Sequence, residues 1–188
     1  MKPLLYFENF LTEEEAKRLE KYIISLPLSQ DIYKIYGKEI KSPRLTCFLS
    51  EISKNYTYSG QTKESIFYSE EIKDIARKIE AFLNVPPGYF NGCLVNLYRD
   101  GYDSISYHKD NEPDMSKDTL IAVISIGAKR NFCLKEDCTG EVTKYPLTNC
   151  SLAVMTNICQ KDYQHAILKE KKINEKRISL TFRNFNMS

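Results

Sequence analysis

The chain has 188 residues, 28% of them charged and 42% hydrophobic, and a formal net charge of +2. A chain of this length forms one domain that can bury a core without disulfides or a structural metal, so a bound metal would serve function. No apolar run approaches the ~20 residues that cross a bilayer, so we expect no membrane partner. The small positive charge permits nucleic-acid binding but does not argue for it, since an ordinary solvated surface explains it equally well.

The six cysteines are scattered without a C-x-x-C pair, and the N-terminal MKPLLYFENF lacks the long apolar region of a secretory signal. We therefore expect reduced thiols and an intracellular location, in the nucleus or the cytoplasm. A zinc site built from the last four cysteines is an alternative, but their gaps of four, eleven and eight residues match no common ligand spacing. These four are Cys133, Cys138, Cys150 and Cys159.

Two amphipathic helices are predicted in the first half of the chain. Thr12 followed by Glu15 has the pattern of a capping box, and apolar residues then recur at helical spacing until Pro27 stops the run. They are Ala16, Leu19, Tyr22, Ile23 and Leu26. A second helix follows Ser69, with Ile72, Ile75, Ile79 and Phe82 on one side. The segment between the helices, rich in Tyr, Lys and Ser, predicts short strands and turns.

After the Pro-Pro-Gly break at residues 86–88 the sequence changes to short strand-like runs separated by turn signals. The runs are GCLVNLY, SISYHKD, TLIAVISIG, RNFCLK, EVTKYPL, SLAVMT, YQHAIL and RISLTFRNF. Such runs without intervening helices predict a sandwich or a barrel, and a cupin-like jelly roll is among the few such architectures. The helices then belong on its outside.

The chain has only two histidines, so their placement is informative. His108 stands in YHKD two residues before Asp110, and because strand side chains alternate, both should project from one face. His165 stands in YQHAIL, near the start of the penultimate strand. Two imidazoles and one carboxylate form the facial triad of non-haem iron sites, which leaves positions open for a co-substrate and oxygen. Alone, H-x-D is weak, since a lone histidine is more often a satisfied polar residue than a ligand.

The last strand, KRISLTFRNF, strengthens this interpretation. Its polar residues Arg177, Ser179, Thr181 and Arg183 alternate with Ile178, Leu180 and Phe182. A surface strand with solvated arginines would show the same alternation. However, two arginines on one face, twelve residues after a candidate metal ligand, suit a small dicarboxylate, because a guanidinium binds a carboxylate bidentately.

Together these motifs give a sequence that resembles the AlkB family of iron(II) and 2-oxoglutarate dioxygenases, and within it the branch that repairs duplex DNA. The resemblance runs in family order through KIYGKEIKSPRLT, NYTYSG, NLYRDGYDSISYHKDNE and RISLTFR. It implies one domain over residues 1–188, mostly β with flanking helices. Residues 90–188 would form a double-stranded β-helix (a cupin-like jelly roll), and residues 1–89 the helices and a nucleotide-recognition hairpin lid.

The resemblance implies that His108, Asp110 and His165 are the iron(II) ligands. The reaction would consume O2, decarboxylate 2-oxoglutarate to succinate and hydroxylate the alkyl carbon on a base nitrogen, after which the product releases an aldehyde. The cofactor carries the difficult chemistry, while the protein supplies geometry and exclusion of competing reactions.

Five residues would bind 2-oxoglutarate by the same resemblance. Arg177 would pair with the distal carboxylate, and Tyr98 could donate a hydrogen bond to it. Asn96 and Arg183 would lie nearer the keto-acid end, and Thr181 would also line the pocket. Taken alone, such residues are commonly a strand tyrosine, a strand-end amide or a surface arginine.

Ser179 is a departure from the family, which usually has asparagine between the two arginines. Serine is shorter and lacks the paired donor and acceptor of an amide. The orientation of Arg177 would therefore rely on water or on a neighbouring side chain.

A base inside a duplex must be flipped out to reach buried iron. Tyr56 and Tyr58 stand where the family stacks the extruded base, with His108 on the opposing wall, and a positively charged methylated base would gain cation–π attraction there. Alternating tyrosines are often only packing. Asn111 and Glu112 could meet the exocyclic amine or the flanking backbone, or could form an ordinary loop.

Ile35, Tyr36, Gly37 and Lys38 resemble the hairpin finger that this branch uses to fill the hole left by a flipped base, where Gly37 permits the tight turn. A plain exposed hairpin is the alternative. Basic residues near the finger and after a later glycine turn would contact phosphates or be ordinary solvated charges. They are Lys34, Lys38, Lys41, Arg44, Lys129 and Arg130.

We therefore expect a monomeric enzyme that dealkylates bases of the 1-methyladenine and 3-methylcytosine type in double-stranded DNA. An RNA demethylase or a protein hydroxylase with the same cofactors is the nearest alternative, although a wedge finger favours duplex DNA. A catalytically silent damage-binding module is a second alternative. The intact set of triad and arginines argues against it, because a protein that only binds has no need of them.

Overall fold

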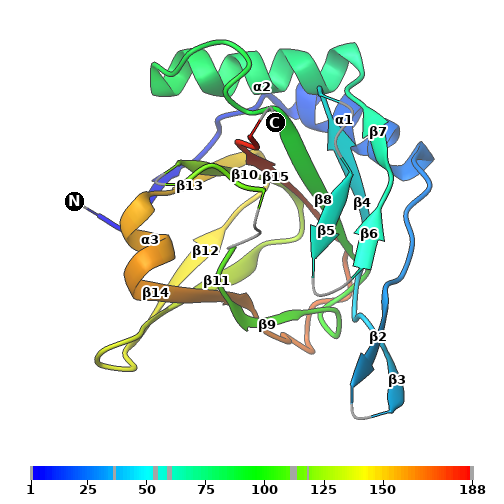
Figure 1. Cartoon of the computed structure of the whole chain (residues 1–188), viewed down its shortest axis with the longest axis vertical. Coiled ribbons are helices and arrows are strands. Elements are labelled where there is room, and N and C mark those ends of the chain that lie inside the picture. The colour runs from blue at the N-terminus through cyan, green and yellow to red at the C-terminus, as the bar shows by residue number, and fades with distance from the viewer. Residues whose placement is uncertain are drawn as a thin grey trace.

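The computed structural model describes residues 2–35, 37–52, 55–58, 61–110, 114–117 and 119–186, with the side chains of residues 34, 35, 56, 58 and 61 excepted. Within these residues two larger sheets lie over each other (Figure 1). The seven-stranded sheet has the order β1 (Leu4–Phe7), β13 (Ser151–Met155), β10 (Ile121–Gly127), β15 (Arg177–Arg183), β8 (Gly92–Tyr98), β4 (Leu45–Ser50) and β7 (Ser65–Phe67). The four-stranded sheet has the order β12 (Val142–Leu147), β11 (Arg130–Glu136), β14 (Tyr163–Ile167) and β9 (Ile105–His108).

Two hairpins stand apart from these sheets. The first pairs β2 (Ile32–Ile35) with β3 (Lys38–Lys41), and the second pairs β5 (Tyr56–Tyr58) with β6 (Gln61–Lys63). The β2–β3 hairpin projects away from the body of the molecule (Figure 1). Its turn carries Gly37 at a φ of +74°, a left-handed conformation that glycine adopts without steric cost.

Each strand-like run predicted after residue 88 forms a strand, and the prediction of a mostly β chain with few helices is confirmed. The strands are divided between the two sheets: β8, β10, β13 and β15 belong to the larger one, and β9, β11, β12 and β14 to the smaller. The cavity described below lies between these two groups. The larger sheet also receives β1, β4 and β7 from the first 89 residues.

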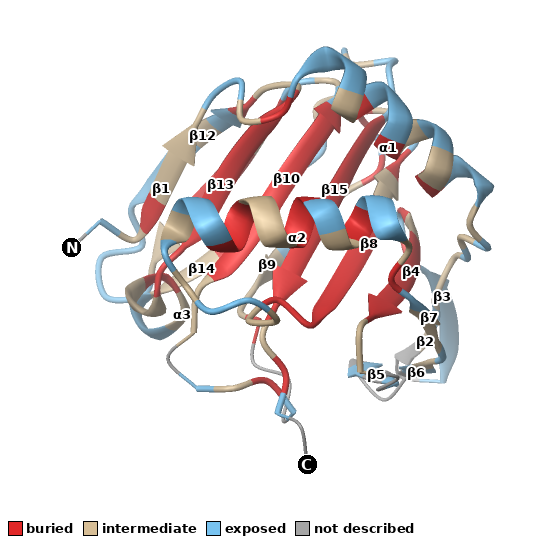
Figure 2. Ribbon diagram, turned by 90° about the horizontal axis from the view of Figure 1, so that it is seen from above, coloured by how far each residue is buried: buried red, intermediate tan, exposed pale blue. Residues whose placement is uncertain are grey.

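Both predicted helices are present. Helix α1 (Glu13–Ser25) begins at the capping box of Thr12 and Glu15, and α2 (Glu70–Leu83) begins at Ser69, whose side chain accepts from the amide of Ile72. The two helices cover the outer face of the seven-stranded sheet (Figure 2). Their apolar sides form one core with the sheet, as predicted. The burial of each large aliphatic side chain in this core contributes roughly 1.5–3 kcal/mol to stability.

Phe82 departs from the predicted buried side of α2. It is 51% exposed and makes edge-on contacts with Phe7 and Phe10, whose ring centroids lie 4.8 and 5.3 Å away. The position lies in the last turn of the helix. Helical spacing is therefore a correct guide to direction here but overestimates burial.

The prediction that no helix interrupts the later strands is wrong. A short helix, α3 (Asn157–Asp162), connects β13 to β14. Strand β9 also ends earlier than expected, at His108, so Asp110 lies beyond the strand rather than inside it. No helix among the described residues is long and apolar enough to span a membrane.

Candidate metal and co-substrate site

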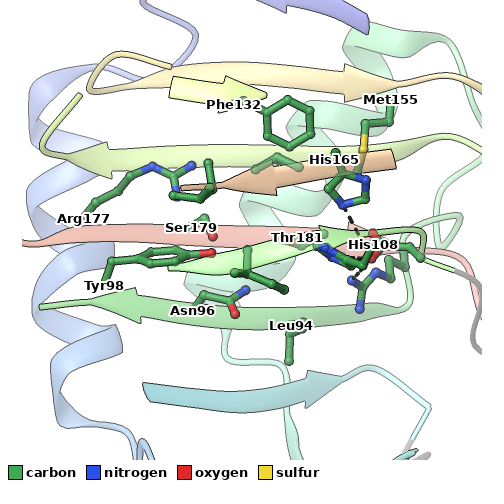
Figure 3. A pocket seen from close by; sticks show the side chains of 15 residues that line it. Leu94, Asn96, Tyr98, His108, Phe132, Met155, His165, Arg177, Ser179 and Thr181 are labelled. Atoms are coloured by element: carbon green, nitrogen blue, oxygen red, sulfur yellow. Dashed lines mark ion pairs between the residues drawn. The ribbon is translucent and has the colours of Figure 1, made fainter. Parts of the chain in front are cut away.

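Strand β15 has two buried faces of opposite chemistry. Ile178, Leu180 and Phe182 face the helices as part of the core. The alternate residues line a cavity between the two sheets (Figure 3). These residues are Arg177, Ser179, Thr181 and Arg183, and all four are buried. The polar face of the last strand is therefore not a solvated surface.

The two histidines come from neighbouring strands of the smaller sheet. His108 on β9 and His165 on β14 are paired directly across the ladder, and their ring centroids lie 4.2 Å apart. Asp110 reaches the same point from the segment after β9: its Oδ1 lies 3.5 Å from Nε2 of His108 and 3.8 Å from Nε2 of His165. Separate parts of the chain thus converge on one point, as predicted.

This group fits a metal ion. One ligand atom from each of His108, Asp110 and His165 lies within 4.8 Å of the others, and two imidazoles with one carboxylate match the donor set of a non-haem iron(II) site. Oδ2 of Asp110 is buried and has no hydrogen-bond partner among the described residues. No other group of His, Cys, Asp or Glu side chains in the described ranges lies close enough to hold a metal, so the alternative of a cysteine zinc site is not supported.

The electrostatics keep these ligands ready for a cation. Burial alone would raise the pKa of Asp110, but the guanidinium of Arg183, with Nη2 3.0 Å from Oδ1, and the two histidines hold that pKa well below its usual value. Burial lowers the pKa of His165 to about 3. Asp110 is therefore anionic and His165 neutral near pH 7, which are the protonation states that metal ligands require.

Arg177 and Tyr98 mark the opposite end of the cavity from the histidines (Figure 3). Arg177 is 1% exposed, its Nη2 donates to Oγ of Ser125 at 2.8 Å, and its guanidinium carbon lies 5.4 Å from the ring centroid of Tyr98. Burial lowers the pKa of Arg177 to about 10, so it remains charged at pH 7. Its Nε and Nη1 find no hydrogen-bond partner among the described residues.

Burying a guanidinium with two nitrogens that lack hydrogen-bond partners costs free energy unless an anion binds to it. A carboxylate of a small organic acid in the cavity would do so bidentately. Because Ser179 stands where the family usually has asparagine, Arg177 is expected to be oriented by water or by a neighbouring side chain. Ser125 on β10, directly opposite Ser179 in the strand register, is such a side chain. Sequence alone gave no signal for Ser125.

The remaining predicted co-substrate residues line the same cavity. Asn96 and Tyr98 come from β8, and Thr181 and Arg183 from β15. Asn96 is held by Arg44, whose Nε donates to its Oδ1 at 2.8 Å. The cavity thus brings together every residue predicted to hold 2-oxoglutarate.

Two arginines predicted to contact phosphates are instead buried. Arg44 is 6% exposed and supports Asn96. Arg130 is 0% exposed and donates to the carbonyl oxygens of Asp100, Asp103 and Leu168. In both cases the guanidinium is needed by polar groups of the interior, so neither arginine belongs to a nucleic-acid surface.

The predicted substrate-binding residues are described only in part. Gly37 and the exposed Lys38 lie in the β2–β3 hairpin. Tyr36, Asn111 and Glu112 lie outside the described residues, as do the side chains of Tyr56 and Tyr58, whose backbone forms β5. Their roles stay predictions. Of the other predicted phosphate contacts, Lys41 and Lys129 are exposed.

Several residues of the site were not predicted from the sequence. The ring of Phe132 stacks on His165 with centroids 5.2 Å apart, and Met155 lines the cavity beside it. Gln160 on α3 accepts a hydrogen bond from the amide of Asp110. Phe132 and Met155 stand at alternating positions of predicted strands, so periodicity could have placed them inside. Nothing in the sequence marks Gln160.

A family model described as the 2OG-Fe(II) oxygenase superfamily matches residues 3–183, nearly the whole chain. The chain belongs to this superfamily. Membership and the triad of His108, Asp110 and His165 imply Fe(II) and 2-oxoglutarate as the groups that this oxygenase site holds.

The similar proteins are AlkB-like members of the superfamily. The human alpha-ketoglutarate-dependent dioxygenase alkB homolog 3 is 34% identical over 153 residues, which cover 76% of this chain and 52% of that protein. The human DNA oxidative demethylase ALKBH2 is 30% identical over 182 residues, covering 91% of this chain and 67% of that protein. The oxygenase thus spans about half the length of the first of these relatives.

The fold is also similar to that of solved structures. The structure of OsALKBH1 superposes with a TM-score of 0.64 at 17% identity, covering 98% of this oxygenase and 99% of that chain. At this identity the likeness concerns the fold alone.

Proposed function

We propose that this oxygenase removes alkyl groups from N-alkylated bases in DNA, of the 1-methyladenine and 3-methylcytosine type, with Fe(II), 2-oxoglutarate and O2, and releases formaldehyde from a methylated base. The observation that carries the oxidative part of this proposal is a single cavity with the triad at one end and the buried, incompletely paired Arg177 at the other. An iron ligand set alone would suit many reactions. A guanidinium at the far end of the cavity is the feature that suits a keto acid with a second carboxylate.

In the proposed reaction the side chains of this protein bind, orient and exclude water. Asp110 and the neutral His165 would hold Fe(II) together with His108, and Arg183 balances the charge of Asp110. Arg177 and Tyr98 anchor the distal carboxylate of 2-oxoglutarate, with Asn96 and Thr181 along the cavity. When bound there, Fe(II) with 2-oxoglutarate would supply the activation of O2 that hydroxylation of the alkyl carbon requires. No protein base is required for that oxidation.

The choice of DNA as the substrate rests on the relatives and on one element of the fold. A relative that matches 91% of this chain is named a DNA oxidative demethylase. The β2–β3 hairpin, which projects from the body of the molecule (Figure 1), carries the segment interpreted as a finger. Lys38 and Lys41 are exposed on β3. We assign this hairpin and β5–β6 to a lid over a flipped base in duplex DNA, with Tyr56, Tyr58, Asn111 and Glu112 as further contacts.

The same proposal treats residues 1–188 as one domain. The two sheets over residues 90–188 would be the two halves of a double-stranded β-helix, and residues 1–89 would supply the helices and the lid. The triad and the proposed co-substrate residues line one cavity of a single chain, which supports the proposal of a monomeric enzyme.

Two alternatives keep the cofactors and change the substrate: an RNA demethylase and a protein hydroxylase. A third is a module that binds damage without turnover. Purified protein with Fe(II), ascorbate and 2-oxoglutarate should release formaldehyde from oligonucleotides that contain 1-methyladenine or 3-methylcytosine. Matched single-stranded DNA, duplex DNA, RNA and peptide substrates separate the alternatives.

Absence of turnover on every DNA form would reject the proposal, and turnover on RNA or peptide alone would replace it by the corresponding alternative. The finger is tested in the same assay, because Tyr36→Ala should reduce duplex repair more than single-strand repair.

A further inference from the structure

The three ligands of the iron site are fixed in different ways. His108 and His165 stand opposite each other in the β9–β14 ladder, so the strand register sets the distance between their imidazoles. Asp110 has no such support, because β9 ends at His108. Its carboxylate is paired with Arg183 on the cavity side, but its backbone must be placed by something other than the sheet.

Helix α3 supplies that support. The backbone amide of Asp110 donates to Oε1 of Gln160 at 3.0 Å. The preceding residue, Lys109, donates through Nζ to the carbonyl oxygen of Lys161 at 2.6 Å and pairs with Oδ2 of Asp137 at 2.6 Å. A side chain of α3 therefore contacts the backbone of the segment that carries Asp110, and a side chain of that segment contacts the backbone of α3.

Both ends of the Gln160 amide are in use. Nε2 donates to Sδ of Met155 at 3.7 Å, and Met155 lines the cavity. An amide of Asp110 needs an acceptor, so the oxygen of Gln160 must face it and the nitrogen must face the sulfur. Because Asp110 is buried, its N–H has no ready access to water as a substitute partner.

We propose that Gln160 is a positioning residue, which holds the backbone of Asp110 so that its carboxylate meets the same ion as the two histidines. Groups that orient metal ligands without touching the metal typically change metal affinity by about 10- to 100-fold when they are removed. The inference rests on the iron site of the proposed function and not on the identity of the substrate.

The test measures binding of Mn(II), a redox-inactive substitute for Fe(II), to the full chain by the loss of the free Mn(II) electron paramagnetic resonance signal. Gln160→Met keeps the length of the side chain but removes its acceptor, and should weaken Mn(II) binding by about 10- to 100-fold. Gln160→Glu keeps an acceptor and should stay within about 3-fold of the parent protein, since one orienting hydrogen bond remains.

Lys161→Met is the matched control. It makes the same kind of polar-to-apolar change at the next residue of α3, where the side chain is exposed and the backbone carbonyl is retained. It should leave Mn(II) affinity within about 2-fold, because it leaves the acceptor of the Asp110 amide, Oε1 of Gln160, in place. Thermal unfolding of the metal-free variants separates a loss of fold from a loss of positioning.

Two outcomes would overturn the inference. One is unchanged Mn(II) affinity in Gln160→Met, with or without a lower melting temperature, which would make the residue structural only. The other is an equal loss in Lys161→Met. The titration contains no nucleic acid, so inactivity on every alkylated substrate would reject the proposed function without touching this result.

A second readout uses the uncoupled conversion of 2-oxoglutarate to succinate. Gln160→Met should lower kcat at a fixed metal concentration and leave KM for 2-oxoglutarate unchanged, because Arg177 lies at the other end of the cavity. A raised KM with unchanged kcat would contradict a role at Asp110.

Discussion

The two faces of β15 are equally inaccessible to water but differ in what they leave unpaired. One face carries Ile178, Leu180 and Phe182, and the other Arg177, Ser179, Thr181 and Arg183. The apolar face packs fully against core residues and has no further requirement. The polar face keeps donors of Arg177 without partners among the described residues. Unsatisfied polar atoms, rather than burial, therefore distinguish the functional face from the stabilising one.

The largest effect is expected on the cavity side. Asp110→Ala removes one of three metal ligands, so turnover should fall by at least ~1000-fold, which corresponds to roughly 4 kcal/mol of transition-state stabilisation. Unfolding should stay cooperative, because the core between sheet and helices is untouched. Formaldehyde release and a thermal melt measure the two quantities. Retained activity would remove Asp110 from the ligand set.

A substitution on the face of β15 toward the helices should lower stability and leave activity unchanged. Leu180→Ala leaves a cavity in the core and should lower the free energy of unfolding by about 2–5 kcal/mol. The activity of each folded molecule should not change, since the side chain points away from the iron site. Denaturant unfolding and assays below the melting temperature test this. A change in KM for 2-oxoglutarate would show that the two faces are coupled.

Arg177→Met sharpens the comparison at a single strand position. Loss of a bidentate charge-assisted contact that contributes roughly 1.5–3 kcal/mol should raise KM for 2-oxoglutarate by about 10- to 150-fold. The co-substrate-free protein should be no less stable than the parent, because the substitution removes a buried and incompletely paired charge. A stability loss like that of Leu180→Ala would mean that Arg177 serves the fold.

The smallest expected effect, counted for each pH unit, is a loss of folding stability of the metal-free protein as the pH falls. Folding lowers the pKa of His165 from 6.5 to about 3, so between these values the unfolded chain binds a proton that the folded protein does not. Stability should therefore be fully present above pH 6.5 and decline as the pH falls, by up to ~1.4 kcal/mol for each pH unit. Denaturant unfolding across this range measures the slope. In His165→Gln the slope should become flatter, and an unchanged slope would assign the effect to other groups.

Much of the fold could be predicted, because hydrophobic periodicity is strong where one face packs on a core. The runs of β8 and β10 to β15 and the caps of α1 and α2 are of this kind. Helix α3 was missed because its six residues, NICQKD, are too few for a 3.6-residue period to appear. Strand β4 carries buried residues on both faces, so it shows no alternation.

The convergence of the triad with Arg177 and Arg183 on one cavity could be predicted because rare residue types stand in an informative order. The supporting residues could not. Arg44 and Arg130 follow turn residues, as surface arginines do, and their interior partners are an amide on β8 and carbonyls of distant loops. Gln160 and Ser125 act on Asp110 and Arg177 through hydrogen bonds between residues that are far apart in the sequence and meet only in the folded chain.

The complete burial of Arg177 has a consequence for ionic strength. Dissolved ions screen exposed charges over about 8–10 Å at 0.1–0.15 M salt but reach a buried pair far less. The exposed lysines of β3, proposed to face phosphates, are fully subject to that screening. Raising the salt concentration should therefore weaken the hold on nucleic acid while leaving the keto acid nearly as tightly bound, so that one variable in the buffer separates the two binding events.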